Sequence, residues 1–433
     1  MESPRKKRHC KTSSSVSGTR WVICTVLLSV VILYIVYRPL PPGFTRKPLD
    51  RFYIHLFESS LRVTYYWPSR LFPKPSTRVW WTRSVLNALS PILGPWWHSD
   101  SILVETQVWD GVTVRVFAPP SNASTNGAVF FIHGGGFALG NIDIYDSFTR
   151  RIARMLNSVV VSVEYRLSPE TPFPGGLHDC ETALEYFLRH AEAKYGVDPR
   201  KVVLMGDSAG GNLVAAITQR RRDTMAKPEI LGQVLLYPLL QLADLQSISY
   251  RYFMKNLQGT SLVDPESVVY YYMFYAGIDM DQHSDLVKYV LVNGHIAPQI
   301  RDKVDRIIDY SSFSYMNYGN ESLPEREAVV HSKVAQRLLA PFIANPSFAP
   351  LMHEDLSRLP PAFVMTCEYD VLRDEGMLYA KRLRDAGVKT ESRNYDNGFH
   401  AMLNFHHEID EASQSMIDIV IWTRDLLKSE WKI

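Results

Sequence analysis

A serine flanked by glycines stands at residues 206–211, which read Gly-Asp-Ser-Ala-Gly-Gly. The apolar run 202–205 precedes it, and a helix-forming stretch begins at Asn212. This is the G-x-S-x-G pattern at a strand-to-helix turn, where small neighbours permit the sharp bend that lifts a serine hydroxyl above a sheet. The pattern predicts that Ser208 is a nucleophile. The alternative is a glycine-rich helix start in which Ser208 is only an N-cap.

A serine nucleophile needs a base, and the base needs a carboxylate to orient it. Asp370 comes just after the apolar run 362–367, and His400 lies in a loop after the predicted strand 390–395. The order Ser208, Asp370, His400 is one of the three chain orders known for this triad. We therefore predict a Ser-His-Asp triad made of these residues.

Neighbouring side chains offer other assignments. His406 and His407 are the alternative bases. Asp374 and Glu375 fall at the start of the next predicted helix, where carboxylates favour the N-terminus, so we expect them to cap it.

Three successive glycines follow the apolar run 128–132 and a histidine. Glycines let backbone N–H groups approach a ligand atom closely, which suits the negative oxygen of a tetrahedral intermediate. A flexible turn is the alternative, and a phosphate loop is disfavoured because Phe137 replaces the required Lys-Ser/Thr pair. The predicted oxyanion hole consists of His133, Gly134, Gly135, Gly136 and the N–H of Ala209.

The elements that must position these residues alternate between strands and helices. Segments 103–109 and 112–117 flank Asp-Gly, which is a hairpin signal. Buried strands are predicted at 128–132, 159–163, 202–205, 233–237 and 362–367. Helices are predicted at 177–193, 212–222 and 376–386. This alternation predicts an α/β fold with a mostly parallel sheet covered by helices on both faces.

The alternation stops between about residues 245 and 350, a stretch rich in tyrosine and phenylalanine. An insertion of this length is more typical of a cap than of a loop. Most of its aromatics are expected to fill the core of the cap, and a few facing a pocket would suit an apolar substrate. The domain prediction is a tip (1–20), an anchor (21–37), an aromatic-rich cap or linker (38–100) and a hydrolase domain (101–433) that contains this insertion.

The chain has 433 residues and a formal net charge of +2. Hydrophobic residues make up 46% and there are only 4 Cys, which excludes disordered and disulfide-framework proteins. No cluster has metal-ligand spacing and no dinucleotide fingerprint is present, so neither a metal nor another cofactor is expected. The charge is uneven. Residues 1–20 carry six basic residues against one acidic, and the rest of the chain is slightly acidic.

Residues 21–37 are uncharged and apolar. As a helix they would rise about 25 Å, close to the hydrocarbon thickness of a bilayer. A core helix, a cleaved signal peptide and a nuclear address at residues 5–8 are alternatives, but the length and the prolines that follow favour an uncleaved signal-anchor. The basic tip should stay cytosolic, which places the body in the lumen. A membrane is therefore an expected partner, and nucleic acid is not.

Two features bear weakly on this topology. Asn122 and Asn320 begin N-x-Ser sequons, which are tentative glycosylation sites. Cys180 and Cys367 would either pair in an oxidising lumen or remain buried thiols.

The motifs together resemble the hormone-sensitive-lipase group of α/β-hydrolases. The matching segments are His133-Gly-Gly-Gly-Phe, residues 164–174 (EYRLSPETPFP), residues 206–212 (GDSAGGN), residues 370–376 (DVLRDEG) and Gly398-Phe-His400. Within this group the anchor and residues 367–374 are most similar to arylacetamide deacetylases and neutral cholesterol ester hydrolases. The resemblance covers about residues 21–430.

The resemblance implies an α/β-hydrolase fold with a helical cap, preceded by one transmembrane helix. It implies that Ser208 is the nucleophile, His400 the base and Asp370 the orienting acid, with the oxyanion hole formed mainly by the N–H groups of Gly135 and Gly136. It also implies a single-pass type II protein of the endoplasmic reticulum membrane whose lumenal domain hydrolyses apolar esters and some amides. Residues 1–20 differ, being longer and more basic than the short cytosolic end of the family.

Other functions remain as alternatives. A small-molecule-binding protein that has lost catalysis is one, although all three triad residues are present here. A peptidase with this triad usually has a further large domain, for which the chain has no room. A cholinesterase-like enzyme would be longer and have Glu in place of Asp207.

Overall fold

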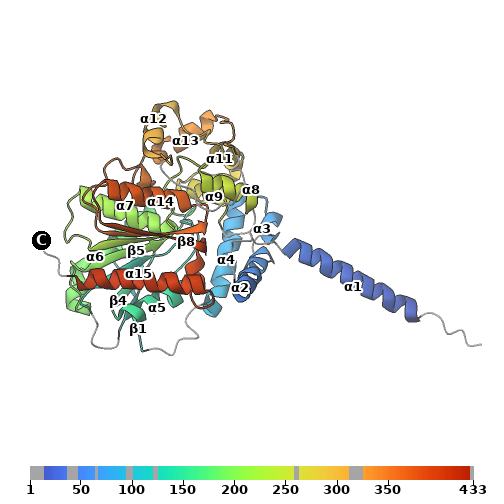
Figure 1. Cartoon of the computed structure of the whole chain (residues 1–433), viewed down its shortest axis with the longest axis horizontal. Coiled ribbons are helices and arrows are strands. Elements are labelled where there is room, and N and C mark those ends of the chain that lie inside the picture. The colour runs from blue at the N-terminus through green and yellow to red at the C-terminus, as the bar shows by residue number, and fades with distance from the viewer. Residues whose placement is uncertain are drawn as a thin grey trace, which may run out of the picture.

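The computed structural model describes residues 14–36, 47–63, 67–93, 101–119, 125–257, 263–311 and 325–429. At its centre lies an eight-stranded sheet with the order β1-β2-β4-β3-β5-β6-β7-β8 (Figure 1). Strands β2 and β1 pair antiparallel, as do β2 and β4, and the other neighbours are parallel. The strands are β1 (Leu103–Trp109), β2 (Val112–Ala118), β3 (Ala128–Ile132), β4 (Val159–Glu164), β5 (Val202–Asp207), β6 (Gly232–Leu236), β7 (Ala362–Tyr369) and β8 (Thr390–Phe399).

The five predicted buried strands correspond to β3 to β7, and their ends agree to within two residues. Successive side chains of a strand point to opposite faces, so a strand covered on both sides needs apolar residues at every position. Val161 and Leu204 accordingly pack in the core on one face of the sheet, and Val160 and Val203 in the core on the other. The predicted hairpin is also confirmed, with Trp109 opposite Val112.

Helices cover both faces of the sheet (Figure 1). One core contains side chains of α6 (Gly175–Tyr195), α7 (Ala209–Asp223) and α14 (Arg373–Asp385). The other contains side chains of α5 (Asp146–Leu156) and α15 (Asp410–Lys428). The three predicted helices therefore form, as α6, α7 and α14, and the prediction of a mostly parallel sheet covered on both faces is confirmed.

Between β6 and β7 the chain forms a helical insertion on the α7 and α14 side of the sheet (Figure 1). Its tyrosines are mainly structural, because Tyr250, Tyr272 and Tyr275 are buried in the same core as α7. The helices are α8 (Ile248–Asn256), α9 (Pro265–Tyr275), α10 (Met280–His283), α11 (Val287–Leu291), α12 (Pro298–Ile307) and α13 (Lys333–Ile343).

Residues 44–100, where no clean periodicity is visible, include three helices. They are α2 (Pro48–Leu61), α3 (Trp67–Leu71) and α4 (Pro75–Leu93). Helix α4 is fastened to the insertion and to the body. Ser76 donates from its N–H and its hydroxyl to the carboxylate of Asp281, and Arg83 donates to the carbonyl oxygen of Ala138.

Two local predictions are only partly right. His400 does lie in a turn after the strand, but β8 continues to Phe399, so the turn begins at His400. Asp374 and Glu375 do lie in the first turn of α14, as expected, but Leu372 is the N-cap and neither carboxylate caps the helix. Both carboxyl groups are buried and accept backbone N–H groups of the chain that leaves β6, because those donors would otherwise be buried without a partner.

The predicted span at residues 21–37 falls largely on α1 (Ser14–Val36). Among the residues that the structure describes, no helix is both long and apolar enough to cross a membrane. Most of the basic tip (residues 1–13) and the sequons at Asn122 and Asn320 lie outside the described residues. Cys180 and Cys367 are buried free thiols that belong to the cores on opposite faces of the sheet.

Candidate active site

Ser208 occupies the sharp turn between β5 and α7. Its backbone has φ +53° and ψ −120°, a conformation that L-residues adopt only where the surroundings enforce it. The turn tolerates no side chain on its far side. A Cβ on Gly210 would lie 2.0 Å from the carbonyl oxygen of Ile132, and one on Gly206 would lie 2.5 Å from that of Gly210. The small residues of the motif are therefore required by this close approach.

The structure brings the three predicted triad residues together. Ser208 Oγ lies 3.0 Å from His400 Nε2, and His400 Nδ1 lies 2.8 Å from Asp370 Oδ2. All three side chains are buried. Because a carboxylate only accepts, Nδ1 carries the proton and Nε2 is left to accept from the serine hydroxyl. This arrangement can move the Ser208 proton to His400 when the oxygen attacks.

Asp370 is held in place by its own turn. The residue follows β7 directly, and its Oδ1 accepts the backbone N–H of Leu372 at 2.9 Å. One oxygen therefore fixes the orientation of the carboxylate, and the other faces the imidazole. The ring of Tyr237, which follows β6, lies 5.0 Å from that of His400 and limits its movement.

The glycine loop lies after β3, next to the serine turn. Gly135 and Gly136 have φ values of +112° and +61°, which favour glycine. Within the described residues, the N–H groups of Gly135, Gly136 and Ala209 make no hydrogen bond. The N–H of Gly134 is already donated to Asp207 Oδ1 at 2.7 Å. The donors available to an anionic oxygen are therefore those of Gly135, Gly136 and Ala209.

The side chain of His133 packs against the glycine loop and holds it in place. Its ring is fully buried, stacks on Tyr165 at 4.4 Å and lies with Nδ1 2.7 Å from the carbonyl oxygen of Gly134. The Tyr165 hydroxyl donates to the carbonyl oxygen of His133. Burial lowers the pKa of His133 to about 4, so the ring is neutral near pH 7. The side chain shapes the loop rather than offering charge to a ligand.

Asp207 joins the two loops, a role that the sequence did not reveal. Its two oxygens accept from Gly134 N–H and from the hydroxyl of Tyr145 at 2.9 Å. Burial raises the pKa of Asp207 to about 6, and these two hydrogen bonds oppose the rise. The position of Asp207 next to the serine was its only signal, since Gly134 is 73 residues away in the chain.

The helical insertion closes over the glycine loop. The ring of Phe137 stacks on Tyr275 of α9 at 3.7 Å, and Tyr275 in turn stacks on Phe348. A Cβ on Gly136 would lie 2.5 Å from the ring of Tyr271. An aromatic side chain of α9 therefore fills the space on the side of Gly136 where any other residue would carry its side chain.

The two alternative bases, His406 and His407, contact other groups. His406 Nδ1 lies 2.8 Å from the carbonyl oxygen of Leu403, and the His407 ring lies beside that of His406. Over the same described ranges, no group of His, Cys, Asp and Glu could hold a metal ion.

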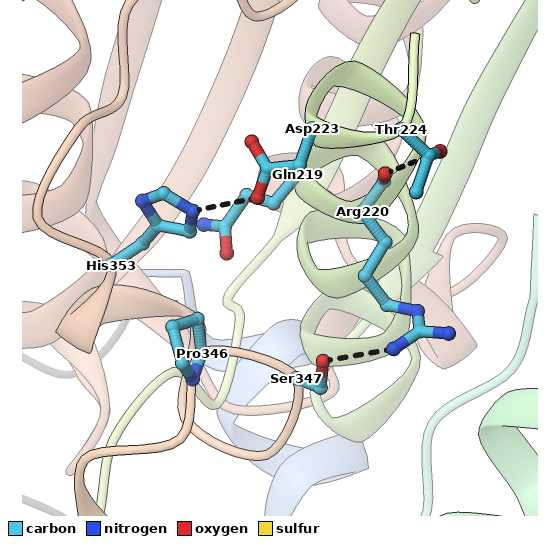
Figure 2. Close-up of a pocket in the computed structure, with 7 residues that line it drawn as sticks. All are labelled: Gln219, Arg220, Asp223, Thr224, Pro346, Ser347 and His353. Atoms are coloured by element: carbon cyan, nitrogen blue, oxygen red, sulfur yellow. Dashed lines mark hydrogen bonds and ion pairs between the residues drawn. The ribbon is translucent and has the colours of Figure 1, made fainter. Parts of the chain in front are cut away.

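A surface pocket of about 300 Å³ lies at the other end of α7 (Figure 2). Its lining includes Gln219, Asp223 and His353, and His353 Nε2 lies 3.0 Å from the Asp223 carboxylate. Ser208 precedes the first residue of α7, and Asp223 is its last, so the two are separated by about 22 Å of helix at 1.5 Å per residue. This pocket is separate from the chemistry at Ser208.

Comparisons with known proteins agree with this geometry. The alpha/beta hydrolase fold family matches residues 129–299 and 317–404. Neutral cholesterol ester hydrolase 1 from Bos taurus is 35% identical over 320 residues, which cover 71% of this chain and 76% of that protein. Arylacetamide deacetylase from Oryctolagus cuniculus is 33% identical over 88% of this chain and 94% of its own length. A hyperthermophilic esterase from the archaeon Pyrobaculum calidifontis superposes with a TM-score of 0.63 at 26% identity, covering 88% of this chain and 98% of the esterase.

Proposed function

Because this chain belongs to the α/β-hydrolase family, in the group of neutral cholesterol ester hydrolases and arylacetamide deacetylases, and is a carboxylic ester hydrolase, we propose that it cleaves apolar esters through an acyl-enzyme on Ser208. The observation that carries this proposal is the hydrogen-bond chain from Ser208 Oγ through His400 to Asp370, with distances of 3.0 and 2.8 Å. Among the described residues, no other side chain forms a hydrogen bond with the Ser208 hydroxyl.

In the first half of the reaction Ser208 Oγ attacks the ester carbonyl carbon, and His400 Nε2 takes the hydroxyl proton. The carbonyl oxygen becomes negative and is stabilised by the N–H groups of Gly135, Gly136 and Ala209. His400 then gives its proton to the leaving alcohol, and Ser208 carries the acyl group.

In the second half water takes the place of the alcohol. His400 removes a proton from the water, the hydroxide attacks the acyl carbon, and the acid leaves as the proton returns to Ser208. Asp370 stays ionised throughout, because its function is to fix the tautomer of His400 and to stabilise the imidazolium form.

The substrate class follows from what surrounds the site. Tyr271 is partly exposed and its ring stands beside Gly136, so the chain offers an aromatic wall next to the glycine loop. Such walls favour apolar acyl or alcohol groups. The names of the two relatives point to a sterol ester and an aryl acetamide, both of which are apolar.

The test uses the full-length chain in detergent with a serine-reactive fluorophosphonate probe and a series of p-nitrophenyl esters. We expect wild type to be labelled and to hydrolyse the esters, and Ser208→Ala to do neither. Ser415→Ala is the matched control, because Ser415 is also buried but lies in α15 and donates to its own helix. Folded wild type that is neither labelled nor active would overturn the esterase proposal in favour of a binding protein on the same fold.

We also propose that the chain is held in the endoplasmic reticulum membrane by residues 21–37, with the hydrolase domain in the lumen. Two facts support this. The segment is uncharged over 17 residues, and the side chains of α1 that the structure describes, such as Leu27 and Val30, are exposed. The basic residues before the segment favour a cytosolic N-terminus.

Topology is tested in microsomes. We expect the protein to stay in the pellet at high pH and its hydrolase domain to resist added protease. A glycosidase-sensitive shift that is lost in the Asn122→Gln/Asn320→Gln variant would add support. Release at high pH, or digestion of the domain in intact vesicles, would overturn this topology.

A further inference from the structure

Helix α2 carries an apolar stripe on its outer side. Leu49, Phe52 and Leu56 are all more than half exposed, and at about 100° per residue they lie within about 60° around the helix axis. Val63, in the helical turn that continues α2, is 56% exposed and falls in the same sector. Contiguous exposed apolar surface of this kind marks an interaction site. We call these four side chains the apolar stripe.

The opposite side of α2 faces the body. Ile54 is buried in the core that contains α5 and α15, and Asp50 and Arg62 are also buried. Glu58 is partly buried and lies about 180° from Leu49 around the helix axis, on the side away from the apolar stripe, and burial raises its pKa to about 8. Both acidic residues of segment 47–74 are thus turned from solvent, and the outer side carries no negative charge.

Helix α3, the next helix along the chain, carries residues that lipid interfaces favour. Trp67 and Leu71 are exposed, Leu71 by 81%, and Arg70 and Lys74 stand exposed beside them. Tryptophan settles at the water–lipid boundary, and arginine and lysine lie over apolar surface while their charges reach headgroup phosphates. Exposed tryptophan and leucine next to basic residues are the combination typical of helices that lie in the interface of an anionic membrane.

The length of the chain limits where the stripe can be. Twelve peptide steps join Val36, the end of α1, to Pro48, the start of α2, and they span at most about 40 Å. Figure 1 shows α1 projecting from the same end of the molecule as α2, α3 and α4. If α1 lies in a bilayer, this tether keeps the start of α2 within about 40 Å of the end of α1, close enough for the stripe to reach the bilayer surface.

We propose that the apolar stripe of α2, with Trp67 and Leu71, is a second membrane contact that rests in the interface of the bilayer holding α1. This inference rests on the proposed membrane association of residues 21–37. Its consequence is a fixed orientation of the hydrolase domain relative to the membrane.

That orientation bears on the active site, because the N-terminal helices are joined to it. In α4, Arg83 donates to the carbonyl oxygens of Ala138 at 3.0 Å and Ser168 at 2.7 Å, and Ala138 is two residues after Gly136. Ser76 of α4 binds Asp281 of the insertion. A membrane contact at α2 and α3 would hold the glycine loop and the insertion near the lipid in which apolar esters dissolve.

The test reconstitutes the full-length chain in phosphatidylcholine vesicles with and without phosphatidylserine. In a Cys10→Ser/Cys24→Ser background, an environment-sensitive fluorophore is attached to Phe52→Cys or to Leu56→Cys. The matched control is Met225→Cys, which is 77% exposed but follows α7 at the end remote from Ser208. We expect a blue shift and quenching by spin-labelled lipid at positions 52 and 56, stronger with phosphatidylserine, and neither at position 225.

A second variant tests the consequence for catalysis. Phe52→Glu/Leu56→Glu is expected to hydrolyse a soluble short-chain ester like wild type and to lose activity on a long-chain ester embedded in vesicles. Phe52→Leu/Leu56→Met keeps the apolar surface and should retain both activities.

The outcomes separate the possible failures. Water-exposed labels at positions 52 and 56 in protein that stays with the vesicles would overturn the second contact and leave the anchor intact. Labels that become buried in detergent as the protein concentration rises would identify a second copy as the occupant and also overturn it. Lipid quenching in a protein that fails to react with the fluorophosphonate would uphold the contact and refute only the esterase proposal.

Discussion

The carboxylate of Asp207 accepts the backbone N–H of Gly134 at 2.7 Å, so the residue before the nucleophile holds the loop that must face it. The contact is tight, since a Cβ on Gly134 would lie 2.7 Å from Asp207 Oδ2. Serine turn and glycine loop come from β5 and β3, which are neighbours in the sheet. The sheet therefore sets the relative position of the serine turn and the glycine loop, and the hydrogen bond to Asp207 fixes it.

Removing the Asp207 carboxylate should lower kcat more than it changes KM. In Asp207→Ala the buried Gly134 N–H loses its partner, which costs about 1–3 kcal/mol, and the loop is free to shift. We expect kcat to fall about tenfold or more with KM little changed, which is less than the 10²–10³ that losing one oxyanion donor costs. Tyr145→Phe removes only the second hydrogen bond and should retain most of kcat. Equal kcat for Asp207→Ala and wild type would refute the locking role.

The Asp370 carboxylate should matter through the tautomer of His400. In Asp370→Asn an amide N–H can face Nδ1, which then favours the proton on Nε2 and removes the acceptor for Ser208. We expect kcat to drop about 10³–10⁴-fold with the fold unchanged. Asp223→Asn alters another Asp–His pair, at 3.0 Å from His353 and remote from the serine, and should leave kcat unchanged. A similar loss in both variants would point to a general effect of the substitution.

The chemistry could be predicted because Ser208 and Asp370 each follow a strand with a clear apolar run, and His400 follows in the chain order known for this triad. The distant partners of Asp207, Asp374 and Glu375 could not, because they are set by contacts between segments 62 to 135 residues apart. Helix α2 could not be predicted from the sequence for another reason. It presents apolar side chains both inward, as at Ile54, and outward along the apolar stripe, so a single helical period does not appear.

Glu375 should give the stability a pH dependence. Burial raises its pKa from 4.5 to about 8 in the folded protein. Between these values the folded state retains a proton that the unfolded chain has released, so this contribution is fully present below about pH 4.5 and is lost as the pH rises to about 8. The free energy of unfolding should thus decrease over that window, by at most about 1.4 kcal/mol per pH unit.

Glu375→Gln tests that assignment, because the amide does not titrate. Its NH₂ group must meet a donor, either the N–H of Leu240 or the amide of Gln241, so the variant should be less stable at low pH. The difference from wild type should shrink as the pH rises, as measured by urea unfolding across the window. A difference that stays constant with pH would show that Glu375 does not titrate there.

Gly136 should be needed for its lack of a side chain as well as for its backbone angle. Gly136→Ala places a Cβ 2.5 Å from the Tyr271 ring in a backbone with φ +61°, so the loop must move away from Ser208 or α9 must shift. The angle alone costs about 1 kcal/mol. Gly196→Ala isolates that cost, since Gly196 has φ +64° and open space around it at the end of α6. We expect similar losses of Tm from the angle in both variants, but a loss of kcat only in Gly136→Ala, partly restored when Tyr271→Ala is added. A kcat that is equally unaffected in both glycine variants would mean that α9 yields to the added Cβ and that catalysis does not require a glycine at position 136.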